Sequence, residues 1–310
     1  MSELSARYEA KAASTRTRHT ILVHVLRYGM LALPAVVIGT FVLWPLLMTV
    51  VHSFDQLDGL GHVTGFAGVA NYQALTASPV FGQVMQNTLV FSVLSVVLSI
   101  GIAFVLAMLL NARALSASRI LLVSLFTPTI MPMIAAANIW LYFLAPQFGV
   151  VDEMLGWLGL GQFNWLGHPG TALGSMIVLF VWKYAPYFTL FLLAGLQAIP
   201  PEVREALRTE DPVGWQSFRR VILPILSPVI AFVTTMAVLY SVETVDPVYA
   251  MTQGGPNNGT NLVMYYLYQL GFNYFSWGQA AALSVLLLIS LSTLSGFALI
   301  VLERRTFHWQ

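Results

Sequence analysis

Six long apolar stretches limit this sequence to one class of fold. They cover about residues 28–51, 85–110, 120–144, 172–197, 223–245 and 279–302. A helix needs about 20 predominantly apolar residues to cross the hydrocarbon core of a bilayer, and each stretch is long enough. The mean hydropathy is +0.76 and 57% of the residues are apolar, which is more than a soluble domain of this size can bury. The sequence therefore predicts an all-α membrane protein with six transmembrane helices.

The distribution of basic residues predicts the orientation of these spans. Five Lys and Arg residues precede the first stretch, two lie between the second and third, four between the fourth and fifth, and two after the sixth. The remaining one is Lys183, within the fourth stretch. The alternate segments, about 52–84, 146–171 and 246–278, contain no Lys or Arg. Because cytoplasmic loops carry an excess of Lys and Arg, both termini are predicted to be cytoplasmic.

One membrane domain is expected. Residues 1–27 form a polar, basic N-terminal arm, residues 28–302 the membrane domain with a cytoplasmic polar segment at about 200–222, and residues 303–310 a cytoplasmic tail. The chain has no cysteine, and its six histidines are scattered without an H-E-x-x-H motif, so neither a disulfide nor a metal centre is predicted. A net charge of +1 gives no indication of a nucleic-acid partner.

A charged segment, "EALRTEDPVGWQSFRRVILP" (205–224), separates the fourth and fifth stretches. Pro200 and Pro201 end the fourth stretch, because proline lacks the backbone donor that a helix needs. Glu210-Asp211-Pro212 then divides two short helical segments. Exposed charges around one large aromatic residue, Trp215, are typical of protein–protein contacts. The pattern favours a helix–turn–helix that docks a cytoplasmic partner, and the alternatives are a plain re-entry loop or a helix held to anionic lipid.

This segment resembles the EAA loop of permease subunits in bacterial ABC importers. Glu205-Ala206-Leu207 matches the beginning of that loop and Leu223-Pro224 its end, although Leu207 replaces the second alanine and Asp211 stands at the family's glycine position. In that family the loop forms coupling helices that sit in a cleft of the ATPase subunit. The resemblance implies that the ATPase-coupling residues are Glu205, Ala206, Leu207, Asp211, Trp215, Phe218, Leu223 and Pro224.

Other segments extend the resemblance to roughly residues 30–305. "VWKYAPYFTLFLLAGLQAIPPEVREAL" (181–207), "DPVYAMTQGGPNNGT" (246–260), "ANYQAL" (70–75) and "NTLVFSV" (87–93) are similar to the carbohydrate branch, the maltose-type and glycerol-3-phosphate-type permeases. The resemblance implies a type I ABC importer permease fold in a bacterial plasma (inner) membrane. It also implies three kinds of partner: a second homologous permease in a heterodimer, two ATPase subunits, and an extracytoplasmic substrate-binding protein that faces Gly254, Gly255 and Pro256.

The chain lacks the motif that a P-loop ATPase requires. G-x-x-x-x-G-K-[ST] places a lysine in a glycine-rich loop, and the only two lysines, Lys11 and Lys183, lie in other surroundings. The chain is therefore expected to be no enzyme and to carry no cofactor, with ATP and Mg held by the partner ATPase.

Polar residues within the apolar stretches mark a candidate substrate path. Ionisable groups in a membrane span are costly, so by default they indicate function. Lys183 lies near the middle of the fourth stretch and shares a helix face with Tyr187, four residues further on. Aromatic rings and polar groups of this kind suit a sugar. The predicted path consists of Trp182, Lys183, Tyr184, Tyr187, Tyr240, Glu243 and Asn138.

Lys183 also has a structural interpretation, which is as well supported as a role in the path. In it, the ammonium pairs with a carboxylate or a carbonyl of the helix bundle. Pro128 and Pro132 predict a kink in the third span, which would make it a pathway helix.

The resemblance implies ATP-driven, binding-protein-dependent import, with a sugar or an oligosaccharide as the expected substrate. Glycerol-3-phosphate or a glycerophosphodiester is the alternative, since Lys183 suits a phosphate. An intramembrane enzyme would need an acid–base or nucleophile constellation, and none is evident in the sequence. A membrane scaffold or sensor, whose charged segment only docks a partner, is a remote alternative.

Overall fold

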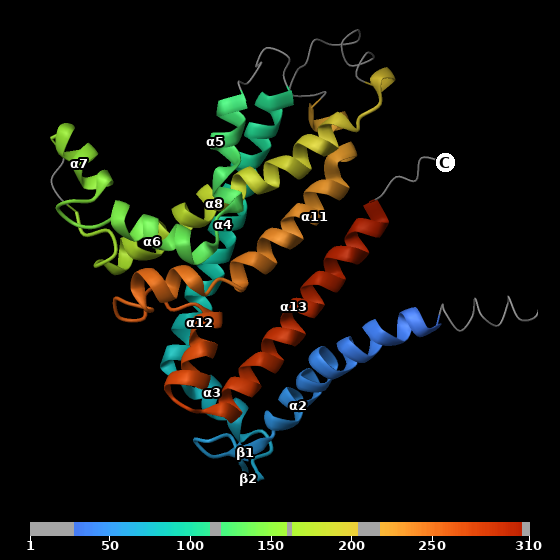
Figure 1. The fold of residues 1–310 in the computed structure, drawn as a ribbon, viewed down its shortest axis with the longest axis vertical. Coiled ribbons are helices and arrows are strands. Elements are labelled where there is room, and N and C mark those ends of the chain that lie inside the picture. The colour runs from blue at the N-terminus through green and yellow to red at the C-terminus, as the bar shows by residue number, and fades with distance from the viewer. Residues whose placement is uncertain (1–27, 112–118, 160–162, 204–217, 306–310) are drawn as a thin grey trace, which may run out of the picture.

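The computed structural model describes residues 28–111, 119–159, 163–203 and 218–305 (Figure 1). The predicted N-terminal arm lies outside the described residues. So does most of the segment predicted to couple to an ATPase, including Glu205, Ala206, Leu207, Asp211 and Trp215.

Long helices make up most of the fold. Among the described residues, five helices are long and apolar enough to cross a membrane: Tyr28–His52, which contains η1 (Gly39–Leu43) and α2 (Trp44–His52); α4 (Pro79–Asn111); α8 (Pro169–Gln197); Arg219–Val242, which contains α11 (Leu223–Val242) after η2 (Phe218–Ile222); and α13 (Trp277–Arg305) over Trp277–Ala298. A sixth span results if the bent pair α5 (Arg119–Ile130) and α6 (Met133–Phe143) is counted as one. The prediction of six spans at these positions is confirmed with that count.

The third span differs from its prediction. Instead of one kinked helix, the span is bent by 113° between α5 and α6. Helix α6 runs across the molecule beside α8 (Figure 1). The break falls at Met131-Pro132, because Pro132 has no N–H to continue the helix and disfavours helical geometry at Met131.

The segments between the spans carry short elements of their own. Residues 52–84 contain an antiparallel pair of strands, β1 (Asp55–Leu57) and β2 (Val63–Phe66), and helix α3 (Ala70–Ala77). The all-α prediction did not include this ribbon. The remaining elements are α7 (Val150–Trp157), η3 (Val248–Thr252), α12 (Val263–Tyr268) and η4 (Gln269–Asn273).

Helix α8 is the centre of the fold. In its most apolar window 56% of residues are buried, against none in the corresponding window of Tyr28–His52. Its N-terminal half packs on α4 through Phe180, whose ring meets Phe91 edge-to-face at 5.7 Å. Its C-terminal half packs on α11 in a cluster that includes Leu192 and Val233. Helix α8 therefore contacts α4, α5, α6 and α11.

Gly195 allows α8 to approach α11 closely. A Cβ atom at this position would lie 2.9 Å from Leu226 Cδ2 and 3.1 Å from Val229 Cγ2. Gly195→Leu is expected to separate the two helices and to lower the free energy of unfolding by about 1–3 kcal/mol, the usual cost of overpacking. Gly174→Leu is the matched control, because Gly174 lies on the same helix and a Cβ there meets nothing within 4 Å. Thermal unfolding of both variants in detergent tests this, and equal melting temperatures would contradict it.

Candidate functional site

A cavity of about 370 Å³ lies where the break between α5 and α6 meets α8 and α11. It brings together four residues of the predicted path, Lys183, Tyr184, Tyr187 and Tyr240. The α5–α6 break supplies Thr129, Met131 and Met133. We call this the lysine–tyrosine pocket.

Lys183 closes the break between α5 and α6. Its side chain is only 6% exposed, and its Nζ donates to the carbonyl oxygen of Pro128 at 3.1 Å and to that of Met131. In an α-helix the Pro128 carbonyl would accept from the N–H of residue 132, which is a proline and has none. Lys183 thus supplies the donor that Pro132 lacks. This geometry matches the structural reading in which Lys183 pairs with a carbonyl.

The pocket wall opposite the break is aromatic. The rings of Tyr184 and Tyr240 stack with their centroids 5.2 Å apart, and Tyr187 lies 6.3 Å from Tyr240. Lys183 Nζ is 5.8 Å from the centre of the Tyr184 ring, within the range of a cation–π contact. Ring faces, hydroxyls and one ammonium therefore surround a single space.

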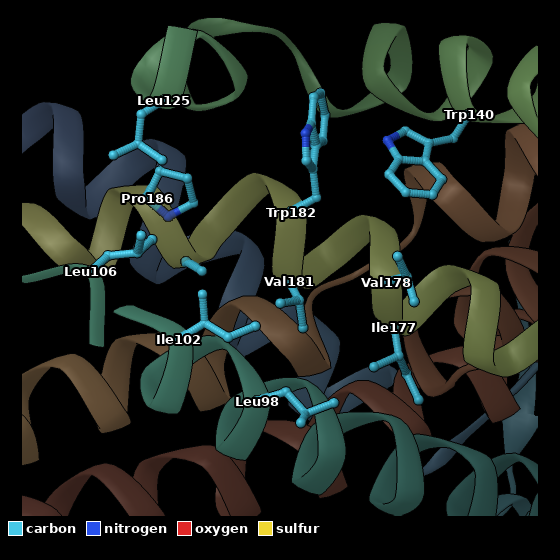
Figure 2. Close-up of a pocket in the computed structure, with 11 residues that line it drawn as sticks. Leu98, Ile102, Leu106, Leu125, Trp140, Ile177, Val178, Val181, Trp182 and Pro186 are labelled. Atoms are coloured by element: carbon cyan, nitrogen blue, oxygen red, sulfur yellow. The ribbon is translucent and has the colours of Figure 1, made fainter. Parts of the chain in front are cut away.

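Trp182 lies outside this pocket. It lines an apolar groove of about 430 Å³ on another face of α8, where its ring is 5.9 Å from Trp140. Figure 2 shows its indole extending from α8 toward the segment that joins α5 and α6. Trp182 therefore lies apart from Lys183 on a different face of α8. A role for it elsewhere on a path stays a prediction.

Asn138 and Glu243 are also separate from the pocket. Asn138 is exposed on α6, and its Nδ2 donates to Ile134 O of the same helix at 2.8 Å. Glu243 is exposed and directly follows the last residue of α11. Neither residue lines the lysine–tyrosine pocket that holds Lys183. A role for them elsewhere on a path stays a prediction.

The loop around Gly254 is held against α4. Asn87 Nδ2 donates to Asn258 O at 2.7 Å and to Asn261 O at 3.3 Å, and Gln83 Nε2 donates to Asn257 O at 2.9 Å. Gly254 is buried with φ of +83°, a conformation that favours glycine. Of the three residues predicted to face a binding protein, Gly255 and Pro256 are half-buried and Gly254 is buried. Their contact with a binding protein stays a prediction.

Asn87→Ala is expected to loosen this loop. The variant loses both donated bonds, and at about 1 kcal/mol for each bond the amides of residues 259–261 should exchange with solvent about 30-fold faster. Gln86→Ala is the control, since Gln86 is exposed on the same helix. Hydrogen exchange followed by mass spectrometry measures both, and unchanged exchange in Asn87→Ala would show that other contacts hold the loop.

Sequence reasoning missed the part of the pocket that α5 and α6 contribute. Thr129, Met131 and Met133 attract no attention as residue types, and backbone carbonyls leave no trace in side-chain patterns. The available signal is "PTIMP" (128–132), in which the second proline removes the donor for the carbonyl of the first. Lys183, the one lysine within the apolar stretches, could have been identified as a donor to that carbonyl.

Three of the predicted coupling residues fall within the described residues. Phe218 begins η2, and Leu223 and Pro224 begin α11. Their coupling role stays a prediction.

The sequence matches the family model of the binding-protein-dependent transport system inner membrane component over residues 99–308. The chain belongs to this family. The family is one of multi-pass permease subunits of the inner membrane, so the predicted permease class is confirmed.

Several relatives align with nearly the whole chain. The diacetylchitobiose uptake system permease protein DasB of Streptomyces coelicolor is 30% identical over 298 residues, which cover 94% of this chain and 91% of the relative. The sn-glycerol-3-phosphate transport system permease protein UgpA of Brucella abortus is 29% identical, with 92% and 97% covered. The lactose transport system permease protein LacF of Rhizobium radiobacter is 32% identical, with 84% and 89% covered.

Two solved structures share the fold. A bacterial ABC transporter involved in the import of the acidic polysaccharide alginate aligns with a TM-score of 0.82 at 23% identity, over 94% of this chain and 100% of that one. The alginate transporter in complex with an alginate pentasaccharide-bound periplasmic protein gives 0.78 at 23%, over 90% and 94%. The predicted ABC importer permease fold is confirmed.

Proposed function

We propose that this permease forms half of the translocation path of an ATP-driven importer for a sugar or an oligosaccharide. The lysine–tyrosine pocket is the observation that carries the proposal. It places three tyrosines and one ammonium around a single cavity near the middle of the central span. Relatives named for diacetylchitobiose and lactose transport support a carbohydrate substrate.

The remaining subunits follow from the family. A second, homologous permease completes the path, two ATPase subunits hold ATP and Mg, and an extracytoplasmic binding protein delivers the substrate. Both termini and the segment 205–224 face the cytoplasm, in agreement with the distribution of Lys and Arg. Closure of the ATPases would move this segment and rock the permeases between inward-open and outward-open states.

A second candidate substrate is glycerol-3-phosphate or a glycerophosphodiester. Its support comes from the 29% identity to UgpA and from the ammonium group in the pocket. The partners and the coupling mechanism would be the same.

Purification from the native membrane tests the proposal. Mass spectrometry of the complex in mild detergent is expected to find a P-loop ATPase, a second six-span permease and a binding protein. If no ATPase accompanies the chain in any of several mild detergents, the proposal is wrong and a scaffold or sensor role takes its place.

A further inference from the structure

Lys183 is a buried cation without a counter-charge in the described part of the chain. The only ion pairs there join His52 to Asp55 and His62 to Asp58, far along the sequence from Lys183. The lining of the lysine–tyrosine pocket contains no carboxylate. A buried charge is costly unless it is paired, so the missing partner needs an explanation.

The carbonyl oxygens of Pro128 and Met131 balance part of the charge of Lys183. They belong to the C-terminal end of α5, where the helix dipole presents a partial negative charge of about half a unit. They also occupy two of the three N–H donors of the ammonium, which leaves one donor for another acceptor. The Lys183 ammonium therefore keeps about half a unit of positive charge that no negative group among the described residues balances, and one N–H donor without an acceptor there. It lines an open cavity.

We propose that the pocket selects substrates with an anionic group, a carboxylate or a phosphate, which binds the free donor of Lys183. The inference rests on the proposed function and narrows its substrate class to acidic sugars or phosphoesters. The charge-assisted hydrogen bond holds the anion, while the stacked faces of Tyr184 and Tyr240 pack on the carbon skeleton. Neutral sugars leave the charge of Lys183 unmatched and bind more weakly.

A competing arrangement places a carboxylate of the second permease against Lys183. That carboxylate would neutralise the pocket in the assembled complex and repel an acidic ligand. The test must therefore use the whole complex and compare acidic ligands with neutral analogues of the same carbon skeleton.

Met133 allows a test that leaves Lys183 in place. It lines the same pocket and is the first residue of α6, where a glutamate is tolerated well by the helix dipole. Met133→Glu supplies an internal counter-charge, whereas Met133→Gln has nearly the same shape without the charge. Both variants keep the bonds from Lys183 to α5, so a difference between them reports the charge of the pocket.

The measurement is saturation-transfer NMR on the complex purified in detergent without its binding protein. One pair of probes is digalacturonate and its dimethyl ester, and the other is sn-glycerol-3-phosphate and glycerol. In the wild-type complex at least one acidic probe is expected to bind at least 10-fold more tightly than its neutral partner. The preference should persist in Met133→Gln and be lost in Met133→Glu. The pair that shows it tells a carboxylate from a phosphate substrate.

Equal binding of acidic and neutral probes, no binding of any probe, or equal preferences in the two Met133 variants would overturn the inference. Failure of the proposed function has a different signature, because it appears as the absence of an ATPase and a binding protein from the native complex.

Discussion

Replacing Lys183 with methionine is expected to reduce substrate uptake by at least 10-fold. The change removes the donor to the carbonyls of Pro128 and Met131 and leaves them unsatisfied at a buried site. An unsatisfied buried group costs about 1–3 kcal/mol, and the hydrocarbon around a span offers no water in exchange. The methionine also removes the cost of burying a charge, so part of this loss is offset. The melting temperature should therefore change little. Uptake should still fall, since the angle between α5 and α6 shapes the pocket.

The matched variants are Lys183→Arg and Leu190→Met. Arginine keeps the charge and the donors and should recover part of the uptake, while Leu190 is an exposed residue of the same helix and should tolerate methionine. ATP-driven uptake into proteoliposomes and thermal unfolding are the two readouts. A Lys183→Met protein that transports and melts like the wild type would show that neither the break nor the pocket depends on Lys183.

The spans were predictable because hydrocarbon imposes a single requirement on the chain. A helix satisfies all of its own backbone groups, so about 20 apolar residues suffice to identify a span. The break in the third span was predictable only as a kink. The angle of the bend depends on which groups donate hydrogen bonds to the freed carbonyl oxygens. Lys183 is such a donor, more than 50 residues away along the chain.

Helical spacing accounts for what was right and wrong about the site. Lys183 and Tyr187 are four residues apart on one uninterrupted helix, and both line the pocket. Tyr240 and Glu243 have similar spacing at the end of α11, but only Tyr240 lines the pocket and Glu243 is exposed. A shared helix face therefore does not by itself place two residues in one cavity.

The loop around Gly254 shows the same limit for long-range contacts. Glycines and asparagines near residue 256 predict a turn. The side chains that hold it come from Gln83 and Asn87, more than 170 residues earlier. Such a pairing leaves no trace in one sequence.

The second large effect is expected for Glu205→Arg. Glu205 opens the EAA-like segment, and we propose that this segment fits a cleft in the ATPase. Reversing a charge that is desolvated in an interface costs about 2–5 kcal/mol, equivalent to a reduction in binding of at least 10-fold. Uptake and substrate-stimulated ATP hydrolysis should both fall at least 10-fold, whereas basal hydrolysis by the ATPase should persist. An added arginine on the cytoplasmic side agrees with the positive-inside rule, so membrane insertion should be normal.

Glu202→Arg is the matched control for this experiment. Glu202 is exposed, lies three residues before Glu205 and undergoes the same change of charge. A general effect of charge on the cytoplasmic surface would appear equally in both variants, because they alter the same segment by the same two units. A specific contact at Glu205 would reduce coupling in that variant alone. If Glu205→Arg keeps substrate-stimulated hydrolysis at the wild-type rate, the force from the ATPase enters the permease through another surface.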